Sequence, residues 1–413
     1  ISLDYFKTVC DKLYDNGISI VLCTPTATPP RWFSYRHPQD MVVNKDGIRM
    51  EHGARQHACY NSPRLRRLGN RITRALAETL GSHPGLLGWQ LDNEIKCHIR
   101  ECFCDNCAAQ FRAWLQEKYG DIETLNRLWG TDIWSERYDC FEQVVLPQKN
   151  TPFPGAHSSL QNAYSEFTMK SAAEFAAEQA AIIREYSQAP VTTNMKNDFY
   201  IDKELLAAHL DFVTFDEYHP AESAWVKLRN YDFYRTMKPG VPFWVMETSP
   251  GHNGSNVGWL HYTHPDGYLQ CEGIAALASG ATGYAYWLWR QQRTGAESPH
   301  GSIIYSWGAK ALGYDNVVDL KRKIDTLTPF LQEGEVERGD IAVVYSERAR
   351  RMAMAEKLYG DMGNYQRMLD TLAWLPLLRC GIHRDMVFES APVDSYKVVV
   401  SPMMIAMSDE YID

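Results

Sequence analysis

The chain has 413 residues, which is long enough to bury a large core and favours two domains. Its 42 Lys and Arg against 51 Asp and Glu give a formal net charge of −9 without long blocks of one sign, so neither a nucleic-acid nor a membrane partner is predicted. No charged and then apolar leader opens the sequence and no apolar run long enough to span a bilayer occurs, so neither export nor a transmembrane helix is predicted.

Short apolar runs that close on polar or turn-forming residues recur along the chain and predict buried strands. The sequence opens on the helical pattern LDYFKTVCDKLYDNG, with Gly17 as its C-cap. The clearest helix is predicted over 165–187, where apolar residues recur every three or four positions and alanines favour helix. The six predicted strands are ISIVLCTPTATPP at 18–30, LLGWQLDNE at 86–94, PVTTNMK at 190–196, DFVTFDEYHP at 211–220, PFWVMETSP at 242–250 and GYAYWLWRQ at 283–291.

Strands buried on both faces that alternate with helices predict an α/β fold with a parallel sheet. Functional-looking residues at the C-terminal ends of the strands favour a (β/α)8 TIM barrel. A doubly wound open sheet is the alternative, but the Gly-rich phosphate loop typical of its first strand is not present. Because six strands are predicted where a barrel has eight, and the sequence opens inside a helix, we expect the first two strands to be missing from this chain.

After TPFLQEGEVERG the pattern restarts as a second α/β unit. A strand IAVVYS at 341, a helix over 365–381 and a strand YKVVVSPMM at 396–404 make one βαβ unit, which has too few strands for a sheet of its own. The sequence therefore predicts a truncated barrel domain over 1–333 and the beginning of a second domain over 334–413.

Two carboxylates end two different strands: Glu94 follows LLGWQLDN and Glu247 follows PFWVM. On a barrel both would face the same mouth. Glycoside hydrolysis needs such a pair, because one carboxylic acid protonates the leaving oxygen and one carboxylate meets the oxocarbenium-like carbon. We therefore predict Glu94 as acid and then base, and Glu247 as nucleophile. A single glutamate more often caps a helix or pairs with arginine, but each of these lies in a Trp-rich apolar run, where a solvated charge is out of place.

Several stretches taken together resemble glycoside hydrolase family 42, the β-galactosidases of a large clan of retaining (β/α)8 enzymes. They are TPTATPPRW, GWQLDNE, the C-x-C-x2-C after it, YGDIETLNRLWGTDIWS, FWVMETSPG and WRQQRTGAESPHG. The resemblance runs to about Glu333 and continues into the start of the family's flavodoxin-like trimerisation domain. It implies a retaining exo-β-galactosidase that acts on terminal non-reducing β-D-galactosides of oligosaccharides, and a homotrimer for the full-length protein.

The resemblance agrees with the roles of Glu94 and Glu247 and implies further residues that bind the substrate. These are Arg55, Asn93, Trp134, Tyr218, Trp259, Glu297 and His300. Two departures from the family bear on this set. The loop ETSPGHNGSNVGW around Trp259 is longer than the family's, and DEYHP around Tyr218 stands where the family more often has Asn between Asp and Tyr.

Three closely spaced cysteines can meet one zinc ion: Cys102, Cys104 and Cys107. The resemblance puts the fourth ligand of a closed site at Cys59. Nearby alternatives are Cys97, His98 and His57. We predict a structural Zn²⁺ that ties the loop after Glu94 to the loop with Arg55. The ten cysteines are not spread as in a secreted disulfide scaffold, which predicts a reducing, cytoplasmic location.

Two alternative functions stay open. The same machinery could act on α-L-arabinopyranosides or β-D-fucosides, which share the ring stereochemistry of galactose apart from the substituent at C6. Outside the enzymes, the missing strands suggest a carbohydrate-binding or assembly fragment that has lost catalysis. A separation of about 5 Å between the Glu94 and Glu247 carboxyl groups is expected for a retaining enzyme.

Overall fold

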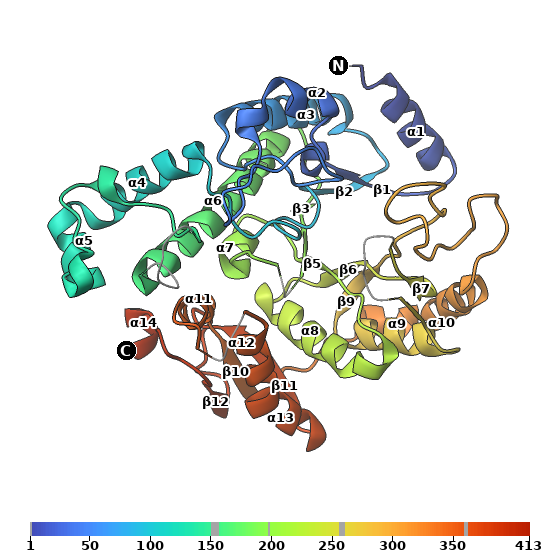
Figure 1. Cartoon of the computed structure of the whole chain (residues 1–413). Coiled ribbons are helices and arrows are strands. Elements are labelled where there is room, and N and C mark those ends of the chain that lie inside the picture. The colour runs from blue at the N-terminus through green and yellow to red at the C-terminus, as the bar shows by residue number, and fades with distance from the viewer. Residues whose placement is uncertain (1, 150–156, 197–198, 256–260, 359–361) are drawn as a thin grey trace.

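The fold is described from a computed structural model of the chain, which covers residues 2–149, 157–196, 199–255, 261–358 and 362–413. Figure 1 shows strands in the middle of the molecule with helices around them, and the residues after 340 gathered beside helices α6 and α8. Two parallel sheets of the first part and one three-stranded parallel sheet near the C-terminus make this an α/β protein.

The strands of the first two sheets are all parallel and follow one another in chain order, β1-β2-β3 and then β4-β5-β6-β9. Only Thr193 separates β3 from β4, so one stretch of chain joins the two sheets. Five of the six predicted strands are confirmed, and the sixth, predicted over 283–291, is confirmed only at 283–284, because β9 ends at Tyr284. Their bounds are β1 Ile20–Cys23, β2 Leu86–Gln90, β3 Val191–Thr192, β4 Asn194–Met195, β5 Thr214–Asp216, β6 Phe243–Glu247 and β9 Ala281–Tyr284.

Helices follow the strands and cover the sheet, as expected of a barrel-type α/β fold. The helix predicted over 165–187 is confirmed as α6, which begins earlier and ends at Arg184. Its Ala172, Ala176 and Ala180 are buried in the core and allow close approach of the neighbouring elements. The helices of this part are α1 Asp4–Asp15, α2 Arg31–Arg36, α3 Pro63–Leu80, α4 Asp105–Tyr119, α5 Ile122–Trp129, α6 Ser158–Arg184, α7 Lys203–Ala207, α8 Ala224–Met237, α9 Tyr268–Ala278 and α10 Tyr314–Glu333. Short 3-10 turns are Pro25–Ala27, Pro38–Asp40, Ile133–Ser135, Phe141–Gln143 and Ala221–Ser223, and a small hairpin pairs β7 His252–Asn253 with β8 Tyr262–Thr263.

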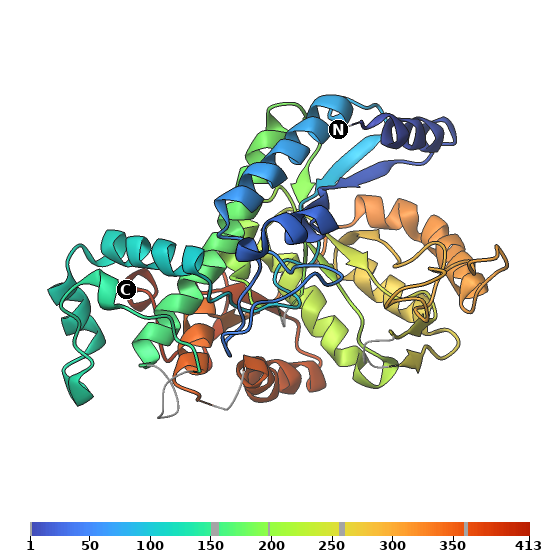
Figure 2. The same cartoon turned by 45° about the horizontal axis from the view of Figure 1, so that its top comes forward.

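Helices α4 and α5 form a projection that lies away from the strands in both Figure 1 and Figure 2. The projection has its own apolar cluster, which includes Phe111, Leu115 and Leu125 and meets Tyr164 and Phe167 of α6. The long helix α6 therefore belongs to two cores, one under the sheet and one under the projection.

The C-terminal part has three parallel strands in the order β11-β10-β12, where one βαβ unit is predicted. The prediction misses β11 Arg384–Phe388, because the sequence RDMVF opens on two charged residues. Both are buried against α8: Arg384 pairs with Asp232 at 3.1 Å, and Asp385 pairs with Arg235 at 2.7 Å. The other elements are β10 Ile341–Tyr345, α11 Glu347–Ala355, α12 Met362–Leu369, a π-helical turn Asp370–Trp374, α13 Leu375–Arg379, β12 Val398–Val400 and α14 Asp409–Ile412.

The two parts share one continuous core. Phe233 of α8 contacts Tyr345 of β10 and Phe388 of β11, with ring centroids 4.8 and 5.4 Å apart. A buried ion pair of 3.2 Å joins Lys203 of α7 to Glu347 of α11. The predicted boundary falls at Glu333, where α10 ends, and the division into two domains stays a prediction.

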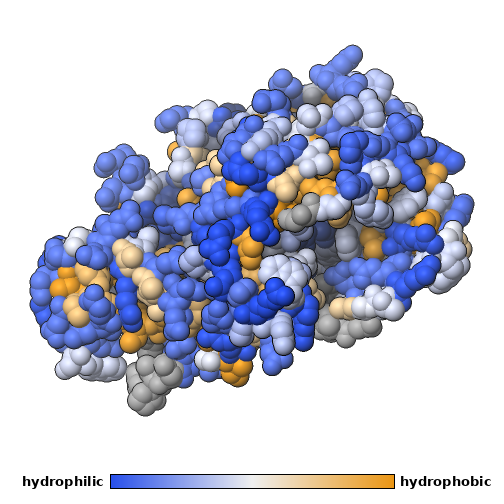
Figure 3. Space-filling view, turned by 90° about the horizontal axis from the view of Figure 1, so that it is seen from above, coloured by the Kyte–Doolittle hydropathy of each residue, from blue (hydrophilic) through white to orange (hydrophobic). Residues whose placement is uncertain are grey.

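The face shown in Figure 3 is mostly hydrophilic, with apolar residues in narrow strips between polar ones. Within the described ranges, each helix is too short or too polar to traverse a lipid bilayer.

Candidate active site and metal centre

Three carboxylates converge beyond the C-terminal ends of the strands. Glu94 lies four residues after β2, Asp216 is the last residue of β5, and Glu247 is the last residue of β6. One carboxylate oxygen of each lies within 4.8 Å of the other two. Asp216 and Glu247 are also partners in the strand register, which explains why they meet. The structure thus brings Glu94 and Glu247 together, and adds Asp216, which the sequence analysis does not single out.

Asn194, the first residue of β4, organises this cluster. Its Oδ1 accepts a hydrogen bond of 2.9 Å from the backbone N–H of Glu94. Its Nδ2 lies 2.8 Å from Asp216 Oδ2, 3.1 Å from Asn93 Oδ1 and 3.3 Å from Glu247 Oε1. Sequence analysis misses Asn194, although an amide inside the predicted strand PVTTNMK is a signal of a polar partner nearby.

The loop after β2 has an unusual backbone. Asp92, Glu94 and Lys96 have φ of 52°, 47° and 61°, in the left-handed region that side chains rarely adopt. Gln56, from the loop after α2, holds this conformation, because its Nε2 donates to the carbonyl oxygens of Asn93 at 3.1 Å and Glu94 at 2.5 Å. Such strain persists only where surrounding contacts hold it, and it is common at functional sites.

Arg55 and Tyr218 contact the two glutamates directly. The Arg55 Nη2 lies 2.5 Å from Glu94 Oε2, and the Tyr218 hydroxyl donates to Glu247 Oε2 at 2.8 Å. Burial and then the negative charge of Glu94 raise the pKa of Glu247 to about 8. Burial and then the charges of Glu247 and Glu94 raise the pKa of Asp216 well above its ordinary value. Glu247 therefore holds a proton at neutral pH, and the pKa of Asp216 is shifted in the same direction.

The loop with Glu297 and His300 reaches the same site. His300 is buried, and its ring stands edge-on to that of Tyr218 with centroids 5.8 Å apart. Burial lowers the pKa of His300, which favours the neutral imidazole. Glu297 Oε2 accepts a hydrogen bond of 3.2 Å from the indole N–H of Trp287.

The two predicted aromatic walls have different outcomes. Trp134 is 77 % exposed in the turn after α5, on the projection, so its place at the sugar pocket stays a prediction. Trp259 lies outside the described residues.

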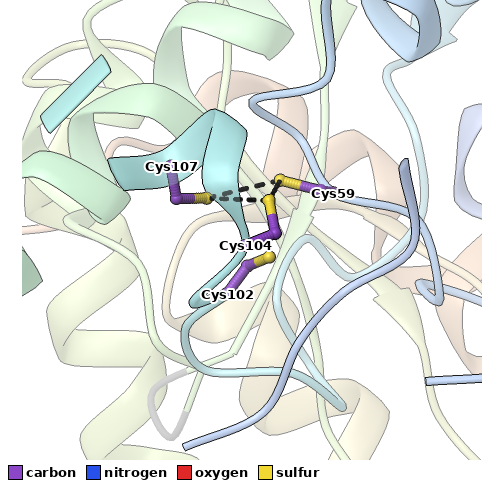
Figure 4. Close-up of side chains that lie close together, drawn as sticks. All are labelled: Cys59, Cys102, Cys104 and Cys107. Carbon is purple, nitrogen blue, oxygen red and sulfur yellow. Dashed lines mark hydrogen bonds between the residues drawn. The ribbon is translucent and has the colours of Figure 1, made fainter. Parts of the chain in front are cut away.

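Four cysteine thiols come together in the arrangement that a tetrahedral metal needs. The Sγ atoms of Cys59, Cys102, Cys104 and Cys107 all lie within 4.8 Å of one another. Three of the separations are 3.4, 3.6 and 3.8 Å, close to the edge of about 3.8 Å for a tetrahedron with Zn–S bonds of about 2.3 Å. Figure 4 shows the thiols of Cys104 and Cys107, at the start of α4, pointing toward that of Cys59 on a separate loop. The donor set fits Zn²⁺.

The geometry also favours Cys59 over the other candidates for the fourth ligand. His98 Nε2 accepts a hydrogen bond of 2.9 Å from Arg55 Nε, and His57 packs against His52 with ring centroids 4.4 Å apart. Backbone and side-chain N–H groups of Asn61 donate to the sulfurs of Cys59 and Cys107, both at 3.3 Å. N–H groups that donate to sulfur in this way stabilise the thiolate form that binds a metal.

Comparison with known proteins identifies the family of this chain. Residues 2–327 match the family profile described as Glyco_hydro_42, beta-galactosidase. The beta-galactosidase YesZ of Bacillus subtilis is 44 % identical over 412 residues, which cover 100 % of this chain and 61 % of YesZ. The beta-galactosidase bgaB of Geobacillus kaustophilus is 31 % identical over 415 residues, which cover 98 % of this chain and 60 % of bgaB. The chain thus spans about three fifths of the length of these curated relatives.

Solved structures agree in fold. The crystal structure of the beta-galactosidase from the psychrophilic Marinomonas has a TM-score of 0.91 at 25 % identity, covering 100 % of this chain and 66 % of that one. The cold-adapted beta-galactosidase from Rahnella has a TM-score of 0.88 at 26 % identity, covering 97 % and 59 %. The resemblance found in the sequence motifs is confirmed, and the chain belongs to glycoside hydrolase family 42, the family of β-galactosidases.

Proposed function

We propose that the protein is a retaining exo-β-galactosidase that hydrolyses terminal, non-reducing β-D-galactosides by double displacement. The observation that carries the proposal is the approach of Glu94 and Glu247 carboxylate oxygens to within 4.8 Å. Retaining enzymes hold their two carboxyl groups about 5–5.5 Å apart, whereas inverting enzymes need about 6.5–9.5 Å to admit a water molecule. Family membership supports the galactoside as the substrate.

In the first step, Glu247 attacks the anomeric carbon of the galactosyl group while Glu94 gives its proton to the leaving glycosidic oxygen. A covalent galactosyl-enzyme forms and the aglycone alcohol leaves. In the second step, Glu94 takes a proton from water, the water oxygen attacks the same carbon, and the bond to Glu247 breaks. Two displacements return galactose with its original anomeric configuration.

This chemistry requires the charge on Glu247 and the proton on Glu94. The hydrogen bond from Tyr218 stabilises the charged form of Glu247. In the free site Arg55 pairs with Glu94. We expect hydroxyl groups of the bound sugar to engage Arg55 and to loosen this ion pair, so that Glu94 carries the proton that the leaving oxygen needs.

The remaining predicted residues would bind the sugar. Asn93 Oδ1 accepts hydrogen bonds from Gln90 and Asn194, at 3.0 and 3.1 Å, which leaves its Nδ2 group as the donor for a hydroxyl next to the reacting carbon. Glu297 and His300 would hold other hydroxyl groups of galactose. Trp134 and Trp259 would supply flat faces for the sugar ring.

The metal centre has a structural role in this proposal. The four thiolates would hold Zn²⁺ in a closed site, which gives a covalent-strength cross-link and no position for a substrate. It would tie the start of α4 to the loop of Cys59, four residues after Arg55. The walls of the pocket are thereby fixed while the carboxylates perform hydrolysis.

For the whole protein, we propose a cytoplasmic homotrimer whose barrel includes two further strands and whose residues 334–413 begin a flavodoxin-like trimerisation domain. The relatives are longer than this chain, which supports such additions. Action on α-L-arabinopyranosides or β-D-fucosides remains the second candidate. A panel of aryl glycosides separates the two, and galactose binding without turnover would favour the non-catalytic alternative.

The direct test is hydrolysis of a nitrophenyl β-galactoside by Glu247→Gln and Glu94→Ala variants. Glu247→Gln should abolish hydrolysis, and azide should restore turnover in Glu94→Ala with a β-galactosyl azide as product. Glu166→Gln, which removes a half-exposed carboxylate paired with Lys118, is the matched control and should hydrolyse normally. Unchanged turnover by Glu247→Gln would end the assignment.

A further inference from the structure

Lys96 is a buried cation whose charge the proposed hydrolysis does not use. It lies two residues after Glu94, is 4 % exposed, and has a left-handed backbone with φ of 61°. Among the described residues its Nζ has no hydrogen-bond partner. Its ammonium stands 4.9 Å from the ring centroid of Tyr200, a weaker contact than the three hydrogen bonds it can donate. A buried charge with so little compensation is costly and needs an explanation.

The surroundings of Lys96 include the metal centre. Lys96 lines the same small cavity as Cys59, Cys102 and Cys107. Glu101 lines it too and is the first anionic group that acts on the charge of Lys96, followed by these three sulfurs.

Glu101 already has other partners. Its Oε1 accepts hydrogen bonds from the hydroxyls of Ser165 at 3.0 Å and Tyr200 at 2.9 Å. Arg100 also lines the cavity, but it is exposed to solvent. Lys96 is therefore the buried cation of this cavity wall.

The charge of a loaded centre explains this arrangement. Zn²⁺ bound by four thiolates carries a net charge of −2, and a buried net charge needs a counter-charge. The N–H groups that face the sulfurs, from Asn61 and from Val43 at 3.5 Å to Cys102, orient dipoles but bring no net charge. Lys96 supplies one positive charge from inside the protein.

We propose that Lys96 is the counter-cation of the four-cysteine zinc centre and that it holds the metal in place. The proposal rests on the metal centre proposed above. Lys96 and Glu94 lie on the same loop after β2. The attraction between Lys96 and the metal centre therefore also draws the loop with Glu94 toward the metal. Lys96 is thus a positioning residue, acting through the metal centre and not on the sugar.

The test is the rate at which zinc leaves the purified, zinc-loaded protein for an excess of a chromogenic chelator. Lys96→Met keeps the length of the side chain without the charge, and Lys96→Arg keeps the charge. Lys96→Met should release zinc about 10- to 100-fold faster than the wild type, which is the usual size of the effect when a group that supports the metal ligands is lost. Lys96→Arg should release zinc at a rate close to that of the wild type. Lys118→Met is the matched control, because Lys118 lies on α4 over the ring of Trp114 at 4.7 Å and pairs with Glu166 at the surface.

If Lys96→Met released zinc at the same rate as the wild type, the proposal would be overturned. The proposal would also be overturned if Lys96→Arg released zinc as fast as Lys96→Met, since the loss of side-chain packing, and not of charge, would then explain the faster release. If Lys96→Met does not fold, Glu101→Gln supplies the test: without the competing anion zinc should leave more slowly, and equal or faster release overturns the proposal. Elemental analysis of the wild type separates the two claims. A wild type without zinc overturns the metal centre and this proposal together, whereas zinc with unchanged release overturns only the role of Lys96.

Discussion

Replacement of Tyr218 by phenylalanine tests how the protein controls the charge of Glu247. The change removes one hydrogen bond of 2.8 Å to a buried carboxylate and leaves the ring in place. Hydrogen bonds to charged groups contribute about 1.5–3 kcal/mol. Because the lost donor stabilises only the charged form, the pKa of Glu247, already about 8, should rise further, by about 1–2 units at about 1.4 kcal/mol per unit.

The assay is the pH profile of kcat/KM for an aryl β-galactoside, which reports groups of the free enzyme. A nucleophile must be ionised, so activity rises with pH through its pKa, and the acidic limb of the Tyr218→Phe profile should move to higher pH by that amount. Below the limb, kcat/KM should fall about tenfold to 150-fold. Tyr231→Phe is the control, since the buried Tyr231 hydroxyl has no hydrogen-bond partner in the described part of the chain. A uniform loss of activity with an unmoved limb would refute the reasoning and assign Tyr218 to substrate binding.

Two further predictions concern residues that sequence analysis does not single out. Asn194→Ala removes the contacts that align Glu94, Asp216 and Glu247. Steady-state kinetics should therefore show kcat lowered about 100-fold or more with a much smaller change in KM. A large change in KM with kcat almost unchanged would contradict a positioning role. Lys203→Met removes one of the two cations that pair with the buried Glu347 and leaves Arg350 at 2.6 Å, so urea unfolding should show a loss of about 1.5–3 kcal/mol. The exposed pair of Lys397 and Asp340 should show almost none after Lys397→Met. Equal effects of the two lysine variants would argue against the shared core.

The sequence predicts the strands well because β3, β4 and β5 are buried throughout and most residues of the others are buried or partly buried, so each reads as an apolar run. The prediction misses β11 because this strand begins with charged residues and does not read as an apolar run. Arg384 and Asp385 are polar in sequence, yet Asp232 and Arg235 neutralise them in the fold. Pairing across more than a hundred residues is not visible in a local pattern.

The residues of the candidate site likewise include some that the sequence predicts and some that it does not. Glu94 and Glu247 are predictable because each carboxylate ends an apolar run, and chemistry requires a pair. Asp216 gains its meaning from strand register, which sets it beside Glu247. Asn194 lies opposite Thr214 in the register and reaches Asp216 through its side-chain amide at 2.8 Å. Cys59 is similar: its thiol meets Cys107 at 3.4 Å through the path of the loop after α2, and spacing alone leaves other ligands open.

The aromatic contact of Phe233 with Tyr345 and Phe388 has a consequence for engineering. A chimera that exchanges residues after 333 for those of a relative would expose the inner side of α8, because that helix forms half of the junction. An exchange of the C-terminal strands should therefore include α8. When either side of the junction is altered, the rates of amide hydrogen exchange in the sheet β4-β5-β6-β9 and in the sheet β11-β10-β12 should change together.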